Sequence, residues 1–283
     1  MRETLKKSVP KPIKSGGRLL YDLLNTRLSQ LKHDYDVKFK QKNPMIPPDA
    51  LVFVGKGNFI EIGEEFLHHF TKIGGLKPAD RVLDVGCGIG RMAIPLTDFL
   101  TEGSYEGFDI VPVGIKWCQE KITKKYPNFN FQLADIYNKI YHREGKYKAA
   151  EYVFPYRDNE FDFIFLTSVF THLLPPDMEN YLAEIARVAK KDGACFITYF
   201  LLNDESRSKI ESGSSTLDFK YERDGCLMVS EEFPESAIAF EEQFVKDLFG
   251  KYGLKINEPV HHGSWSGRKD FLTYQDVIVA EKL

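Results

Sequence analysis

The chain has 283 residues, 43% apolar and 28% charged, with a formal net charge of −3. This length and composition suit one large domain, alone or with appendages. No apolar run approaches the roughly 20 residues that a bilayer-spanning helix needs, and the amino terminus lacks the apolar core of a signal peptide. The four cysteines lie far apart without a Cys-x-x-Cys pair, which is typical of free thiols in a reducing compartment. We therefore expect a cytoplasmic protein without a metal site or a disulfide framework.

Residues 1–42 carry a strong positive charge, with eleven Lys or Arg against four acids. Apolar residues at helical spacing predict an amphipathic helix from about Arg18 to Lys40. They are Leu20, Leu23, Leu24, Leu28, Leu31 and Tyr35. We expect residues 1–50 to be an extension packed on a main domain at 51–283, with contact to an anionic membrane surface or a partner protein as the alternative. The acidic remainder of the chain disfavours an extended nucleic-acid footprint.

The first strand ends in a glycine-rich turn. A helix predicted at Ile60–Ile73 leads into Val82, Leu83 and Val85, which suit a strand buried on both faces. In the turn Gly86-Cys87-Gly88-Ile89-Gly90, the missing side chains let backbone N–H groups approach a ligand closely. A helix from Arg91 to about Leu100 would point its positive end at the same place.

The spacing of the glycines separates two kinds of ligand. The dinucleotide fingerprint places its third glycine three positions after the second, but Arg91 stands there and Gly90 comes one residue earlier. Asp84 lies inside the run, where its carboxylate can meet a ligand's ammonium group directly or through water. These features favour a zwitterionic amino-acid tail over a pyrophosphate. A glycine-rich turn of another α/β domain, and a nicotinamide dehydrogenase, stay open as alternatives.

At these residues the chain resembles the class I S-adenosylmethionine-dependent methyltransferases, whose first motif has an acid followed by a Gly-x-Gly-x-Gly turn. The resemblance runs from about Leu51 to the carboxyl terminus and makes S-adenosylmethionine the expected cofactor. The residues expected to bind it are Asp84, Gly86, Cys87, Gly88, Gly90, Arg91, Asp109, Ile110, Ala134, Asp135, Ile136 and Thr167.

Two further acids end predicted strands downstream. Ser104–Ile110 is predicted as the second strand, and Asp109 follows the glycines by about twenty residues, the interval expected of a carboxylate that accepts both ribose hydroxyls. The third strand, Phe129–Leu133, is followed by Ala134-Asp135-Ile136. The resemblance makes Asp135 the acceptor for the adenine amino group and puts Ile136 against the ring. A single Asp at a strand end is more often a cap or turn residue, but three behind successive strands favour a cofactor site.

The remaining elements alternate between helices and strands, as a doubly wound sheet requires. Beyond the helix that follows Asp109, helices are predicted at Pro175–Lys190 and Ser236–Tyr252, and strands at Phe161–Leu166, Ala194–Phe200, Leu254–Val260 and Gln275–Ala280. The expected fold is therefore α/β, with a doubly wound, seven-stranded, mostly parallel sheet of the Rossmann-like kind. In the family that the chain resembles, the last strand runs antiparallel.

Three segments exceed the usual short connections and are expected to select the acceptor. Residues 137–160 and 201–234 are predicted as inserted loops. The third segment, 261–268, joins the last two strands, and its His, Trp and Arg side chains could contact a polyhydroxylated or acidic acceptor. The alternative is that Trp265 is a local packing anchor and Arg268 forms a surface ion pair.

Methyl transfer from a sulfonium depends mainly on alignment and desolvation, and a general base helps when the acceptor is an alcohol. His172, directly after the fourth strand, is the first candidate for that base, and His261 or His262 is the second. We expect O-methylation of a small molecule or of a sugar unit in a glycan, and a narrower likeness points to methyltransferases of glycan and secondary-metabolite pathways. The alternatives are a protein or RNA methyltransferase, or a non-catalytic cofactor-binding module of the same fold.

Overall fold

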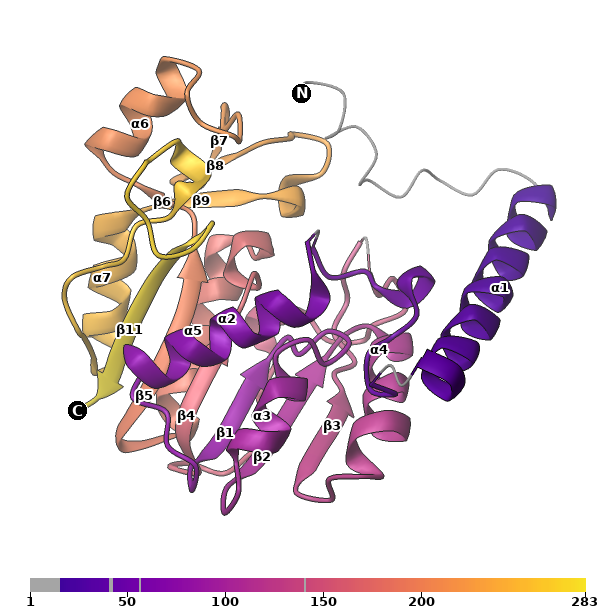
Figure 1. Cartoon of the computed structure of the whole chain (residues 1–283). Helices are drawn as coiled ribbons and strands as arrows, with labels where there is room; N and C mark the ends of the chain where they lie inside the picture. Colours follow the sequence, from indigo (N-terminus) through magenta and orange to yellow (C-terminus); the bar gives the residue numbers. More distant parts are fainter. Residues whose placement is uncertain (1–15, 41–42, 56, 140) are drawn as a thin grey trace.

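The computed structural model of the chain describes residues 16–40, 43–55, 57–139 and 141–283, with side chains from residue 25 onward. In these residues a main sheet has the strand order β10-β11-β5-β4-β1-β2-β3 (Figure 1). Its strands are β1 (Arg81–Val85), β2 (Ser104–Asp109), β3 (Phe129–Leu133), β4 (Phe161–Leu166), β5 (Ala189–Tyr199), β10 (Leu254–Ile256) and β11 (Asp276–Lys282). β11 runs antiparallel to β5 and β10, while the other neighbouring pairs are parallel. The predicted seven-stranded, mostly parallel sheet with an antiparallel last strand is confirmed.

Helices cover both faces of this sheet because alternate strand residues face opposite sides. Ile164 and Leu166 of β4 pack in one core with α5 and α7, whereas Phe163 and Phe165 pack in a second core with α2, α3 and α4. The bounds are α2 (Phe59–Lys72), α3 (Ala93–Phe99), α4 (Pro112–Cys118), α5 (Pro175–Val188) and α7 (Glu242–Lys251). Burial on both faces explains why β4 is apolar at nearly every position.

The segment 201–234, which is predicted as a loop, contains a helix and three short strands as well as irregular stretches. It contains β6 (Leu201–Leu202), α6 (Asp204–Glu211), β7 (Tyr221–Arg223) and β8 (Cys226–Met228). With β9 (Ile238–Glu241) these strands form a second sheet in the order β6-β9-β8-β7, over a small core that includes Phe200, Phe219 and Trp265. Strands of two to four residues are too short to show an alternating pattern in the sequence.

The helix predicted over Ser236–Tyr252 begins only at Glu242. Phe240 fits the helical spacing, but it lies in β9 and pairs with Leu201 and Cys226 of the second sheet. Long-range strand pairing therefore overrides the local pattern there. The strand predicted to end at Val260 is also shorter, because β10 stops before Pro259, which has no N–H to donate.

The predicted amino-terminal helix lies within α1 (Gly16–Lys40), which stands beside α4 (Figure 1). It is attached through His33, whose Nε2 lies 2.6 Å from the carbonyl oxygen of Ile46 and whose ring meets Trp117 of α4 edge-on. The side chains of Leu20, Leu23 and Leu24 lie outside the described residues. Within the described part of the chain, none of the helices combines the length and apolar character needed to cross a bilayer.

Candidate active site

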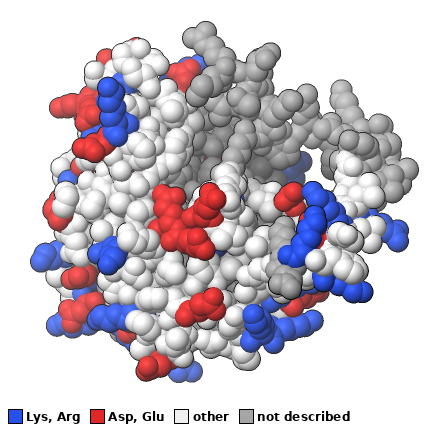
Figure 2. Space-filling model, viewed as in Figure 1, with Lys and Arg blue, Asp and Glu red and all other residues white. Residues whose placement is uncertain are grey.

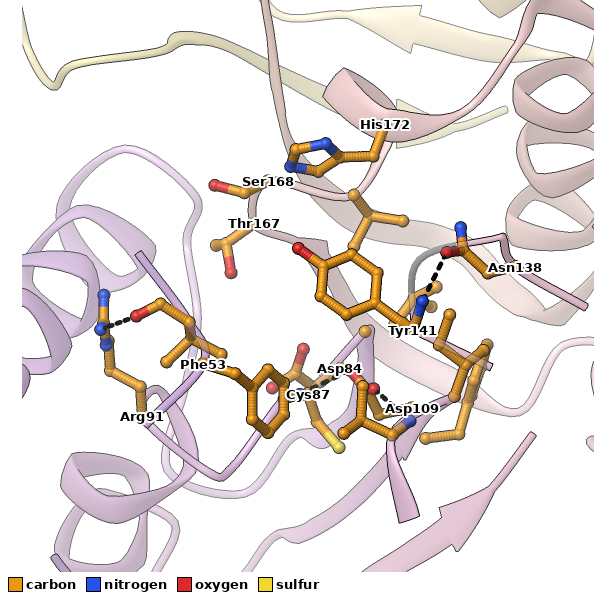
Figure 3. A pocket seen from close by; sticks show the side chains of 18 of the residues that line it. Phe53, Asp84, Cys87, Arg91, Asp109, Asn138, Tyr141, Thr167, Ser168 and His172 are labelled. Atoms are coloured by element: carbon orange, nitrogen blue, oxygen red, sulfur yellow. Dashed lines mark hydrogen bonds between the residues drawn. The ribbon is translucent and has the colours of Figure 1, made fainter. Parts of the chain in front are cut away.

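A cavity of about 290 Å³ lies at the carboxyl ends of β1, β2 and β4 (Figure 3), where a doubly wound sheet binds its ligands. Its wall comes from the glycine turn, from residues after β2 and β4, from residues 53–55 and from the insertion at 137–160. Most of the predicted cofactor residues contribute to it: Asp84, Gly86, Cys87, Gly88, Arg91, Asp109, Ile110, Ile136 and Thr167. Gly90, Ala134 and Asp135 are not part of the wall.

The glycine turn has a backbone that other residues rarely adopt. Gly86 and Gly88 have φ angles of +82° and +58°. A Cβ added to Gly86 would lie 2.4 Å from Cγ2 of Val169, and one added to Gly88 would lie 2.6 Å from Cγ1 of Val54. Gly90 faces away, because a Cβ there would meet an isoleucine in the segment after α4 at 2.7 Å. The first two glycines therefore shape the cavity wall, and the third lets the turn pack on the helical layer behind it.

Gly86→Ala is expected to lower the free energy of unfolding by about 1–3 kcal/mol more than the matched control Gly75→Ala. Both glycines have positive φ, but an added Cβ at Gly75 has nothing within 4 Å, whereas at Gly86 it meets Val169. The control therefore reports backbone strain alone. Urea unfolding of the two variants measures the difference, and equal losses would contradict a close contact at the turn.

Asp84 has a buried carboxylate that is only partly hydrogen-bonded within the described residues. Its Oδ2 accepts a hydrogen bond from the Tyr105 hydroxyl at 2.6 Å, whereas its Oδ1 has no partner there. Burial raises the pKa of Asp84 to about 8, because desolvation disfavours the charged form. A buried acceptor without a donor costs free energy, and a ligand ammonium group would supply that donor. The carboxylate therefore fits the amino end of S-adenosylmethionine.

Asp109 ends β2 and ties the glycine turn to the start of α4. Its Oδ2 accepts the N–H of Gly88 and its Oδ1 accepts the N–H of Val111, each at 2.8 Å. Burial raises the pKa of Asp109, although these donors act in the opposite direction. Each oxygen keeps a second lone pair. The carboxylate can therefore still accept the two ribose hydroxyls that the sequence predicts.

Asp135 is engaged with the insertion rather than with the cavity. Its Oδ2 lies 3.3 Å from Nζ of Lys146, and its Oδ1 lies 3.9 Å from Nε2 of His142. The next residue, Ile136, does line the cavity. Of the three predicted acids, the structure brings Asp84 and Asp109 together on the wall, and the adenine contact of Asp135 stays a prediction.

His172 is the candidate base that reaches the cavity wall (Figure 3). Its Nδ1 lies 2.7 Å from the carbonyl oxygen of Glu235, so this nitrogen donates and Nε2 is left as an acceptor. Burial lowers the pKa of His172, which favours the neutral ring. In Figure 3 the ring points toward Ser168 and Thr167, which follow β4 directly and also line the cavity. A neutral imidazole with an acceptor nitrogen at the cavity can take a proton from a bound alcohol.

The alternative bases, His261 and His262, lie away from this cavity. They line a separate hollow together with Arg268, and Nε2 of His262 lies 2.9 Å from Oε2 of Glu242. β10 is parallel to the central strands, so the segment 261–268, which follows β10, does lie at the carboxyl end of the sheet, as the sequence predicts. However, β11 and β5 stand between β10 and the strands that carry the cofactor residues.

Of the two interpretations of Trp265, the packing anchor is confirmed and the acceptor contact is wrong, because its side chain is fully buried. Its Nε1 donates to Oδ2 of Asp276 at 2.7 Å, and its ring packs on Phe200 and Phe219. Arg268 pairs with Glu205 at 2.7 Å. The segment 261–268 therefore anchors the second sheet to the main one.

Arg91 binds residues 53–55, a segment that no pattern in the sequence marks as part of the site. Its guanidinium donates to the carbonyl oxygens of Val54 and Gly55, the latter at 2.9 Å, and lies 5.2 Å over the ring of Phe59. These bonds keep residues 53–55 on the cavity wall beside the glycine turn. The segment is a loop without periodicity, so no helix or strand pattern could have marked it.

Residues 59–257 match a family model described as a methyltransferase domain. A sterol 24-C-methyltransferase of Schizosaccharomyces pombe is 29% identical over 143 residues, which cover 50% of this chain and 34% of that relative. A phthiotriol/phenolphthiotriol dimycocerosates methyltransferase of Mycobacterium leprae is 30% identical over 127 residues, with coverages of 45% and 40%. The chain thus spans well under half the length of these curated relatives.

Two solved structures share the fold. A magnesium protoporphyrin IX methyltransferase from Synechocystis PCC 6803, with bound SAH, has a TM-score of 0.52 and 16% identity over 90% of this chain and 99% of that one. A protein of Pyrococcus horikoshii OT3 has a TM-score of 0.55 and 15% identity, with coverages of 88% and 99%. At these identities the likeness concerns the fold alone. The family match covers residues 59–257, which is more than half of the chain, and the main sheet has the strand order β10-β11-β5-β4-β1-β2-β3. The chain therefore belongs to the class I S-adenosylmethionine-dependent methyltransferase family.

Proposed function

We propose that this chain transfers the methyl group of S-adenosylmethionine to a hydroxyl oxygen of a small molecule. When bound, the cofactor supplies an electrophilic methyl carbon on a positively charged sulfur. The observation that carries the proposal is the presence of His172 on the cavity wall that also contains Asp84 and Asp109, and burial lowers the pKa of His172, which favours its neutral form. Nε2 of His172 would take the proton of the acceptor hydroxyl as that oxygen forms its bond to the methyl carbon, and the electron pair of the broken carbon–sulfur bond would stay on sulfur. The products are a methyl ether and S-adenosylhomocysteine.

The cavity wall supports an acceptor with a largely apolar body. Aromatic and aliphatic side chains dominate it beyond the cofactor residues: Phe53, Ile62, Phe66, Tyr137, Tyr141, Val169, Leu173 and Tyr181. Two of the relatives are named for sterol and phthiotriol substrates, which supports the same chemical class for this chain. We therefore place a lipid-like alcohol before a sugar unit of a glycan. Such an acceptor resides in membranes, which gives the basic amino-terminal helix a role in reaching it.

Transfer of a labelled methyl group to a panel of acceptors tests this proposal. The panel contains sterols and long-chain diols on one side and oligosaccharides on the other. We expect label in the lipid extract that survives alkaline hydrolysis, because an ether resists base and a methyl ester does not. Label in the oligosaccharide fraction would assign a sugar acceptor instead. Cofactor binding without transfer to any acceptor would favour a non-catalytic module.

A further inference from the structure

α1 carries a row of large apolar side chains that face solvent. Leu28, Leu31, Tyr35 and Phe39 are 63%, 59%, 55% and 62% exposed. Their spacing of three or four residues places them on one face of the helix. Single exposed apolar residues are ordinary, but a contiguous row marks an interaction surface. We call these four residues the α1 stripe.

The opposite face of α1 is already packed on the body of the protein. His33 is buried between Ile46 and Trp117, and Oγ of Ser29 accepts the N–H of Ala50 at 3.3 Å. At about 100° per residue, Ser29 and His33 lie roughly 115° and 155° around the helix from the centre of the α1 stripe. The helix therefore cannot turn the stripe inward without breaking these contacts, so the occupant of the stripe must come from outside the described chain.

Basic side chains flank the α1 stripe. At about 100° per residue, Lys32 lies along one edge and Arg27 and Lys38 lie along the other. Figure 2 shows Lys and Arg side chains, with some Asp and Glu among them, on the part of the surface where α1 and α4 lie. We propose that the α1 stripe docks on an anionic lipid surface. Its apolar side chains would enter the boundary between headgroups and acyl chains, and the flanking cations would meet lipid phosphates.

A second copy of the chain is the competing occupant, because positions 28, 31 and 35 also suit a coiled coil. In such a dimer the edges of the two stripes would bring Lys32, Arg27 and Lys38 together as like charges, which opposes pairing. Asp34 lies beyond Arg27, farther from the stripe. The rings of Tyr35 and Phe39 lie 4.8 Å apart, and aromatic side chains favour the membrane–water interface. Charge and composition therefore favour lipid over a second copy.

The attachment of α1 also relates the lipid surface to the cavity. α1 packs on residues 43–51, which lead directly to the cavity-lining Phe53, and on α4, which follows the cavity-lining Val111. A helix docked on lipid would hold the cavity close to the surface where apolar alcohols reside. The inference concerns binding alone, so it stands or falls separately from the methyl-transfer reaction.

Co-sedimentation of the full chain with lipid vesicles tests the proposal. We expect binding to vesicles of phosphatidylcholine with phosphatidylglycerol, much weaker binding to phosphatidylcholine alone, and release by high salt. Phe39→Gln should lower the partition coefficient about tenfold, whereas Phe271→Gln, a matched aromatic that is 55% exposed on a distant loop, should not. Lys32→Glu should lower it about fivefold or more, and Lys255→Glu, on β10 at the far edge of the sheet, should not.

Cofactor binding and thermal unfolding of the same samples show that each variant is folded. No binding to the anionic vesicles would overturn the proposal, as would equal losses for Phe39→Gln and Phe271→Gln. A dimer in sedimentation velocity that Phe39→Gln dissociates, in a protein that does not bind vesicles, would assign the α1 stripe to a second copy instead.

Discussion

His172→Asn is expected to lower kcat by about 10²–10⁴-fold and to leave the dissociation constant for S-adenosylmethionine nearly unchanged. Nδ1 of His172 donates to the carbonyl oxygen of Glu235, and an Asn amide offers a similar donor while removing the proton acceptor at Nε2. The variant therefore removes the proton acceptor, while the side chain keeps its hydrogen bond to Glu235 and its place on the cavity wall. Steady-state kinetics at saturating cofactor give kcat, and calorimetry gives the dissociation constant.

The pH dependence of kcat/KM shows whether His172 acts as a general base or only supports the cavity wall. Burial lowers the pKa of His172, so the acid limb of kcat/KM should lie below the ordinary histidine value of about 6.5. Protonation fills Nε2, so the rate falls as pH falls through that pKa, and His172→Asn should lack this limb. His262→Asn is the matched control and should keep its kcat, because His262 is paired with Glu242 outside the cavity. A fully active His172→Asn variant would remove His172 as the base.

Asp84→Asn is expected to raise the dissociation constant for S-adenosylmethionine by about ten- to a hundredfold near neutral pH. The unpartnered Oδ1 of Asp84 is the acceptor available to the ligand's ammonium group. An Asn amide would present either a neutral oxygen or an N–H there, and the N–H would oppose the ammonium. Calorimetry at several pH values measures the change.

The pKa of Asp84 gives this variant a distinctive pH dependence. With a pKa of about 8 the carboxyl is protonated in the free protein at neutral pH, and binding an ammonium group requires its ionised form. The affinity of the wild-type chain should therefore increase from about pH 6 to pH 8 with release of a proton, and Asp84→Asn should lack this increase. A flat wild-type profile would contradict an Asp84–ammonium contact.

As pH rises, the free energy of unfolding of the cofactor-free chain should fall, whereas its affinity for S-adenosylmethionine should increase. The folded pKa of Asp84 is raised to about 8, while its unfolded value is about 3.9. Between these values the unfolded chain releases the proton and the folded chain keeps it, so the contribution of Asp84 to stability is lost as pH rises. Without the cofactor, Asp84→Asn should thus be more stable than the wild type near pH 8. Weaker binding with greater stability is a result that general misfolding cannot produce.

The sequence predicts best those elements whose physics is local. β4 is buried on both faces, so its residues form a continuous apolar run that identifies a central strand. The turn at Gly86 follows β1 directly, Asp109 is the last residue of β2, and parallel strands bring their carboxyl ends to one edge of the sheet. This part of the site could therefore be predicted without coordinates.

The elements that the sequence does not predict depend on distant partners. β9 exists because Phe240 pairs with β6 and β8, although its spacing suits a helix. Trp265 is buried by Phe200 and Phe219, which are far away in the chain. The direction of the Asp135 carboxylate likewise depends on Lys146 in the insertion. Hydrophobic periodicity contains no information about such contacts.

The bonds from Arg91 to Val54 and Gly55 bear on where the cofactor-binding unit begins. The family match starts at residue 59, after both of these carbonyl acceptors. A chain that started there would keep every strand of the main sheet, yet one wall of its cavity would be missing and the Arg91 guanidinium would have lost its two acceptors. The family match and the wall of the cavity therefore have different amino-terminal boundaries.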